Sequence, residues 1–121
     1  MEILNDCHSV IYEVNLKINL QIEEDFLKWL KEHVVEMLNI EGFLEATIST
    51  PELIEENNSV KLITCSYKVS SREMLKNYFD NHSQKMREDG IKRFGSQFTA
   101  ERRILLALTE FKKSIKIDSL K

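Results

Sequence analysis

The sequence has few residues of the kinds that form linkers or covalent cross-links. Its 121 residues include one proline, Pro51, and three glycines, which are too few to supply a flexible linker between domains. The two cysteines, Cys7 and Cys65, are too few for a disulfide framework, and neither has the neighbours at the spacing typical of a metal site. We therefore expect a single domain without a metal.

Long apolar runs are also missing. No apolar stretch approaches the ~18 residues that a membrane-spanning helix needs, and the first ten residues lack the apolar centre of a signal peptide. The 17 basic and 20 acidic residues give a net charge of −3, whereas most nucleic-acid binders are basic. These absences predict a cytoplasmic protein that binds neither membranes nor nucleic acids.

The sequence contains no recognisable catalytic motif. Gly42, Gly90 and Gly95 are isolated, so they form no glycine-rich phosphate-binding loop. The serines and threonines show neither a nucleophile elbow nor an ordered triad. We expect no cofactor, and the sequence leaves open whether the protein is an enzyme.

What the sequence does contain is an ordered series of hydrophobic periods. Strand-like alternation occurs in four segments, residues 10–19, 43–50, 60–69 and 98–108. Helical spacing occurs in two segments, residues 22–39 and 71–88.

The resulting order, βαββαβ, predicts an α+β, ferredoxin-like fold. In this fold a four-stranded antiparallel sheet carries two helices on one face. We expect one α+β domain over residues 1–121, with its core at about 10–108 and a C-terminal tail at 109–121. Many unrelated functions use this fold, so the fold alone does not identify the function.

Two histidines lie on the apolar faces predicted for the helices. His33 follows Trp29 by one turn on the first helix, and His82 lies in the middle of the second. A neutral imidazole in such a place can act as a general base or contact a ligand. The alternative is a core histidine that is hydrogen-bonded to a backbone carbonyl or a tyrosine, because an unpaired buried polar group costs ~1–3 kcal/mol.

Tyrosines and arginines supply further candidates. Tyr12 and Tyr67 lie on the core-facing sides of predicted strands and either donate to a ligand or only pack. Arg93, Arg102 and Arg103 form the one compact cationic set, suited to a carboxylate or phosphate or to pairing with nearby acids. The candidate ligand-binding residues are therefore Tyr12, Trp29, His33, Tyr67, His82, Arg93 and Arg102.

A set of these residues resembles the pattern of a family of small uncharacterised bacterial proteins, grouped by sequence as a domain of unknown function. The set comprises Trp29, His33, Gly42-Phe43, Tyr78, His82, Arg93-Phe94-Gly95, Phe98 and Glu101-Arg102-Arg103. The resemblance covers about residues 10–108, and its most specific parts are Trp29-x3-His33 and Arg93-Phe94.

That family is similar to the dimeric α+β-barrel proteins, which include antibiotic-biosynthesis monooxygenase-like and EthD-like groups. The resemblance implies a homodimer in which the open faces of two sheets meet, with ligand cavities between each sheet and its own helices. It assigns no activity, and the residue pattern of the haem-degrading members is missing here.

These observations favour a homodimeric α+β-barrel protein that binds a small organic molecule between sheet and helices. One alternative is a non-enzymatic protein-interaction or regulatory module that uses the same dimer. Another is an RNA-binding domain, because RNA-recognition domains share this strand order. The negative charge and the single aromatic residue of the third predicted strand, Tyr67, argue against RNA binding.

Overall fold

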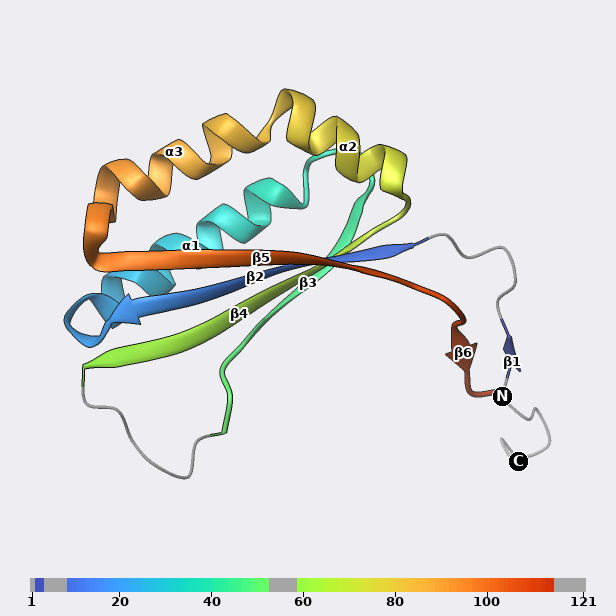
Figure 1. Ribbon diagram of the computed structural model, residues 1–121, viewed down its shortest axis with the longest axis horizontal. Coiled ribbons are helices and arrows are strands. Elements are labelled where there is room, and N and C mark those ends of the chain that lie inside the picture. The colour runs from blue at the N-terminus through green and yellow to red at the C-terminus, as the bar shows by residue number, and fades with distance from the viewer. Residues whose placement is uncertain (1, 4–8, 53–58, 115–121) are drawn as a thin grey trace, which may run out of the picture.

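The described part of the chain is built around a four-stranded antiparallel sheet with all its helices on one face (Figure 1). The structure is a computed structural model that describes residues 2–3, 9–52 and 59–114. The strands of this sheet are β2 (Val10–Asn19), β3 (Phe43–Ser49), β4 (Val60–Val69) and β5 (Phe98–Leu106). The helices are α1 (Glu23–Met37), α2 (Arg72–Asn81) and α3 (Ser83–Phe94). The predicted ferredoxin-like fold is confirmed.

The spatial order of the strands is β3-β4-β2-β5, so the first strand of the motif lies inside the sheet and the last lies at its edge. A small separate ribbon pairs β1 (Glu2–Ile3) with β6 (Phe111–Lys112) beyond the end of the sheet (Figure 1). Short 3-10 turns, Leu20–Ile22 and Gly95–Gln97, join β2 to α1 and α3 to β5. Cys7 lies outside the described residues, as does the tail beyond residue 114.

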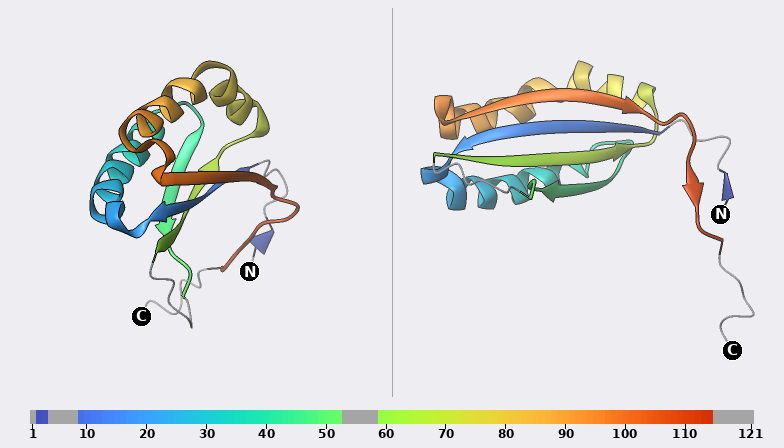
Figure 2. Two further views of the ribbon diagram at one scale, coloured as in Figure 1. Left: turned by 60° about the vertical axis from the view of Figure 1, so that its left-hand side comes forward. Right: turned by 60° about the horizontal axis from the view of Figure 1, so that its bottom comes forward.

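The register of β2 divides the sheet into two different faces. Tyr12 lies opposite Tyr67 on β4 and Ile104 on β5, and these side chains point toward the helices. The next residue, Glu13, lies opposite Arg103 on β5 and points to the other face. Figure 2 shows the helices gathered on one side of the sheet, so the second face is open.

The hydrophobic core fills the space between the sheet and the helices. Phe26 of α1 is fully buried, and its ring centre lies 5.0 Å from that of Phe94 and 5.3 Å from that of Phe98. Tyr12 is 1% exposed and contacts the ring of Tyr78. Burial of a large apolar side chain stabilises a fold by about 1.5–3 kcal/mol, so this aromatic layer holds the helices to the sheet.

The second helical segment differs from the prediction. Ser71 caps α2, because its hydroxyl accepts a hydrogen bond from the backbone N–H of Met74 at 3.2 Å. The single helix predicted over residues 71–88 is wrong, because the chain leaves helical geometry at His82 (φ −131°, ψ −31°) and starts α3 at Ser83. The Ser83 hydroxyl donates to the carbonyl of Phe79 at 3.1 Å, a local bond of the kind that bends helices.

Candidate functional site

A cavity of about 410 Å³ lies between the helices and the sheet. Its inner wall is formed by buried residues of β2, β4 and α1, including Tyr12, Leu16 and Cys65. Its exposed lining residues include Ile91 on α3 and Arg102 on β5, which places the opening between these two elements. The volume falls within the ~300–1,000 Å³ typical of small-molecule sites.

One end of the cavity is built around the indole of Trp29. The ring N–H of Trp29 donates to Oδ2 of Asp89 at 2.7 Å, which ties α1 to α3. The imidazole of His33 stacks on the indole at 4.7 Å and 24°. At Gly90, α3 lies so close to the indole that a Cβ added there would lie 2.8 Å from Cη2 of Trp29. The tight contact and the hydrogen bond fix the flat ring at the cavity wall.

His33 is neutral at physiological pH in this environment. Desolvation by burial lowers the pKa of its imidazole, and the charges of Glu36 and Asp89 only partly oppose that effect. A neutral imidazole keeps one nitrogen free to accept a proton or a hydrogen bond. His33 therefore offers the cavity a flat ring and a basic nitrogen without a charge.

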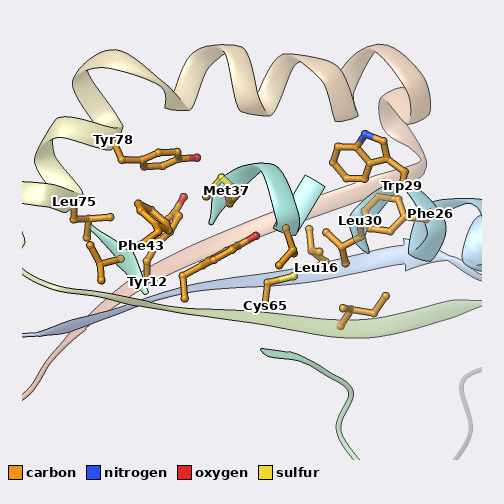
Figure 3. Close-up of a cluster of buried hydrophobic side chains, with 14 of the residues drawn as sticks. Tyr12, Leu16, Phe26, Trp29, Leu30, Met37, Phe43, Cys65, Leu75 and Tyr78 are labelled. Carbon is orange, nitrogen blue, oxygen red and sulfur yellow. The ribbon is translucent and has the colours of Figure 1, made fainter. Parts of the chain in front are cut away.

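The other end of the cavity is lined by tyrosines. In Figure 3, Trp29 lies at one end of the buried cluster and Tyr78 at the other. The ring of Tyr12 lies 5.9 Å from that of Tyr67 and 5.7 Å from that of Tyr78. Burial raises the pKa of both Tyr67 and Tyr78, so their hydroxyls stay protonated and can donate hydrogen bonds.

The buried thiol beside the tyrosines is unreactive. Burial raises the pKa of Cys65 to about 11, with a weaker opposing effect of the hydrogen bond to Tyr67. Only the thiolate is a good nucleophile, so the Cys65 side chain acts as a small apolar group in the cavity wall.

Two arginines reach the cavity from opposite sides. Arg87 of α3 donates from Nη2 to the hydroxyl of Tyr12 at 3.3 Å, and its guanidinium carbon lies 6.0 Å from the ring centre of Phe79. Arg102 of β5 lies opposite Val14, so it stands on the helix-facing side of the sheet. Neither aspartate nor glutamate lines the cavity among the described residues.

The structure brings five of the seven predicted site residues together in this cavity. They are Tyr12, Trp29, His33, Tyr67 and Arg102. Their roles in binding stay predictions, but they line one cavity although they come from four elements, β2, α1, β4 and β5.

The other two predicted residues lie elsewhere. The expectation that His82 lies on a core-facing surface is wrong: the break between α2 and α3 turns it outward, and it is exposed. Arg93 is also exposed and does not line the cavity; its Nε lies 3.7 Å from Oδ1 of Asp89, one turn earlier on α3. Placing His82 at the site required one uninterrupted helix, which the chain does not form.

The prediction also missed two residues of the site, Tyr78 and Arg87. Tyr78 lies on the apolar face of the second predicted helix but is not among the candidate ligand-binding residues, and neither is Arg87. When α3 is treated as a separate helix, its inward face follows the spacing Ser83, Arg87, Gly90 and Phe94. The signal for the break was the run Asn81-His82-Ser83, whose members have low helix propensity.

The open face of the sheet has a different character. The Nε of Arg103 lies 2.8 Å from Oε1 of Glu13, and Asn15 donates to that same oxygen at 2.9 Å. Thr64 in turn donates to the side-chain oxygen of Asn15 at 2.8 Å. The hydrogen bonds from Asn15 and Arg103 lower the pKa of Glu13, which keeps its carboxylate ionised.

The described part of the chain contains neither a cluster of metal ligands nor a membrane-spanning helix. Among residues 2–3, 9–52 and 59–114, no three histidine, cysteine, aspartate or glutamate side chains are grouped so that they could hold a metal ion. In the same ranges, no helix has the length and apolar character needed to cross a bilayer.

Several solved structures have the same fold. A dimeric ferredoxin-like protein from an uncultured marine organism superposes with a TM-score of 0.67 at 10% identity, covering 86% of this chain and 99% of the other. A putative antibiotic biosynthesis monooxygenase from Bacillus cereus gives 0.60 at 9% identity, with 88% and 99% covered. SnoaB, a cofactor-independent oxygenase from Streptomyces nogalater, gives 0.61 at 10% identity, with 86% and 98% covered. At such low identities the similarity shows the fold alone.

Sequence comparison identifies the family of the chain. No curated protein matches it. The model of a family described as Domain of unknown function (DUF4286) matches residues 9–108, which include the whole four-stranded sheet, the three helices and the cavity. The chain therefore belongs to the DUF4286 family.

Proposed function

We propose that this protein is a homodimer that binds a small organic molecule in the cavity between its helices and its sheet. The cavity itself carries the proposal: it has about 410 Å³ of space, mostly apolar and aromatic walls and a few convergent polar groups. This combination is typical of sites for small organic ligands.

The proposed contacts come from both ends of the cavity. Trp29 and His33 offer stacked flat rings to an apolar body, whereas Tyr12 and Tyr67 offer hydroxyls and Arg102 offers a charge. A neutral His33 would also suit proton abstraction without a cofactor. SnoaB, which shares this fold, is described as a cofactor-independent oxygenase. Whether this chain catalyses any reaction depends on the ligand.

The proposed dimer would join two open sheet faces. Support comes from the fold, because the similar marine protein is described as dimeric, and from the open face itself. Its central polar groups, Glu13, Asn15, Thr64 and Arg103, already satisfy one another. Such a network can be buried against a second copy without leaving unpaired charges.

Ligand binding can be tested through the fluorescence of Trp29, the single tryptophan of the sequence. We expect members of a library of small aromatic and aliphatic compounds to change its emission saturably in the native protein. The variant Ala100→Leu, which adds volume at the cavity wall, should weaken binding at least tenfold, whereas Ala107→Leu, outside the cavity, should not. Failure of every compound, or equal binding by Ala100→Leu, would overturn the cavity proposal.

The assembly can be tested separately by light scattering after size exclusion. The proposal predicts a particle of twice the chain mass of 14.2 kDa at micromolar concentration. A monomeric mass under these conditions would reject the dimer and would leave the cavity proposal unaffected.

A further inference from the structure

We infer that the ligand of this cavity is a small aromatic carboxylate whose charged group binds at Arg87 and whose ring lies toward Trp29. This inference rests on the proposed function, because it names the class of molecule that the proposed cavity takes. It is carried by the placement of two arginines, by the groups around them and by the lining of the cavity.

The first observation concerns the side chain of Arg87. Its Nε is buried and has no hydrogen-bond partner among the described residues, while Nη2 donates to Tyr12. The ring of Phe79 covers one side of the guanidinium at 6.0 Å. An unpaired buried N–H of a charged group is costly, so the fold presents a donor that lacks its acceptor.

The second observation is a positive charge without a counter-ion. Arg87 and Arg102 both line the cavity, and none of the described lining residues is acidic. Asp89, which directly precedes the lining residue Gly90, already accepts a hydrogen bond from the indole of Trp29 and pairs with Arg93. The cavity is therefore cationic although the chain carries a net charge of −3.

The third observation shows that the two arginines act at one place. Burial raises the pKa of the Tyr78 hydroxyl, and the charges of Arg87 and Arg102 both oppose that rise. Both guanidinium groups therefore lie within electrostatic reach of the same hydroxyl. Arginine presents its N–H groups in a fork that matches the two oxygens of a carboxylate, and the Tyr78 hydroxyl adds a donor.

The remaining walls indicate what the anion is attached to. The cavity continues from the tyrosines toward Trp29 and Phe26, which lie together at the far end of the cluster in Figure 3. The stacked pair of Trp29 and His33 offers a flat surface, and the uncharged imidazole adds no second cationic centre there. A free inorganic anion would leave this apolar end unfilled, whereas an aromatic carboxylate fits both ends.

The test compares three probes with one naphthalene body, namely naphthoate, naphthalenemethanol and naphthylmethylammonium, by titration calorimetry of the full chain. We expect the carboxylate to bind at least tenfold more tightly than the alcohol, and the ammonium to bind most weakly. Arg87→Met should lower the affinity for naphthoate about ten- to a hundredfold while leaving that for the alcohol unchanged.

Two further variants distinguish a loss of ligand contacts from an effect on folding. Arg102→Met changes an exposed side chain and should lower the affinity for naphthoate by a smaller factor, because solvent screens its charge. Arg93→Met removes a matched arginine of the same helix outside the cavity and should change nothing.

The outcomes separate the two proposals. Equal binding of the alcohol and the carboxylate, or unchanged binding of naphthoate by Arg87→Met, would overturn the assignment of an anion and leave the cavity as a ligand site. If none of the three probes binds, the carboxylate assignment falls, and the library screen then decides whether the cavity proposal falls with it.

Discussion

The two faces of the sheet differ in whether their polar side chains have partners. On the open face, Glu13 has both Arg103 and Asn15 as partners, and its carboxylate is held ionised. On the helix-facing side, Arg87 keeps a buried Nε without an acceptor, and the side chain of Arg102 takes part in none of the hydrogen bonds or ion pairs found within the described residues.

This difference indicates what each face is built to meet. A face whose charges are already paired can press against an identical face without a desolvation penalty from unpaired groups. A cavity that holds unpaired cationic donors among aromatic walls needs a partner of the opposite charge. One face therefore suits self-association, and the other suits a ligand.

The largest expected effect is on stability, in the core that covers the helix-facing side of the sheet. Phe26 is fully buried beneath α1, so Phe26→Ala should lower the free energy of unfolding by about 3–5 kcal/mol, since it removes a ring from the aromatic layer. Val35 lies on the same helix but is 63% exposed, and Val35→Ala should change it by no more than about 0.5 kcal/mol. Urea unfolding measures both, and equal effects would contradict the assigned core.

Charge reversal should act on the open face through assembly. Arg103→Glu places two carboxylates beside each other, Glu13 and the new side chain, and repulsion across the interface should raise the dimer dissociation constant at least tenfold. The swap of both charges, Glu13→Arg with Arg103→Glu, should return the dissociation constant to its native value. Sedimentation equilibrium measures the constant, and a dimer unaffected by the single reversal would place the interface elsewhere.

A methyl group at Gly90 should disturb the cavity. Gly90→Ala gains up to about 1 kcal/mol of helix propensity but meets the ring of Trp29, and such overpacking costs about 1–3 kcal/mol. We expect a net loss of stability, together with a shift in the emission of Trp29.

Gly95 provides the control for that substitution. An added Cβ there meets no atom within 4 Å, but the backbone has φ +54°, so Gly95→Ala should lower stability without moving the emission. Equal emission shifts in the two variants would show that the contact between Gly90 and Trp29 does not set the position of the indole.

The smallest expected effect is a dependence of the free energy of unfolding on pH that arises from His33. Burial lowers the pKa of its imidazole in the fold below the ordinary value of about 6.5, so the unfolded chain binds the proton more readily. Its contribution to stability should be complete above about pH 6.5 and decline as the pH falls from there toward the folded pKa.

This pH dependence should disappear in His33→Gln and persist in His82→Asn, because His82 is exposed. Chemical unfolding between pH 5 and 8 measures it. An unchanged slope in His33→Gln would assign the dependence to another group.

The sequence was sufficient to predict the order of elements and most of the inward-facing residues. Alternation along β2 and β4 placed Tyr12 and Tyr67 beneath the helices, because a period of two leaves a strand only two faces. Helical spacing likewise placed Trp29 and His33 on the inner side of α1. Local periodicity is enough to predict the inward-facing residues wherever an element stays regular.

The sequence was insufficient where an element is interrupted. A one-residue break at His82 changes the phase of every residue that follows, so the period assumed for one long helix wrongly assigned His82 to the core. The hydrogen bond between Arg87 and Tyr12 joins residues far apart in the chain, and no local period predicts it.

The central claim concerns the free donor of Arg87, and the NMR signal of its Nε–H group tests that claim most directly. On titration with naphthoate, the account predicts a saturable downfield shift of this side-chain signal, as the carboxylate supplies the missing acceptor. A signal that does not respond to naphthoate, or that responds equally to naphthalenemethanol, would contradict it.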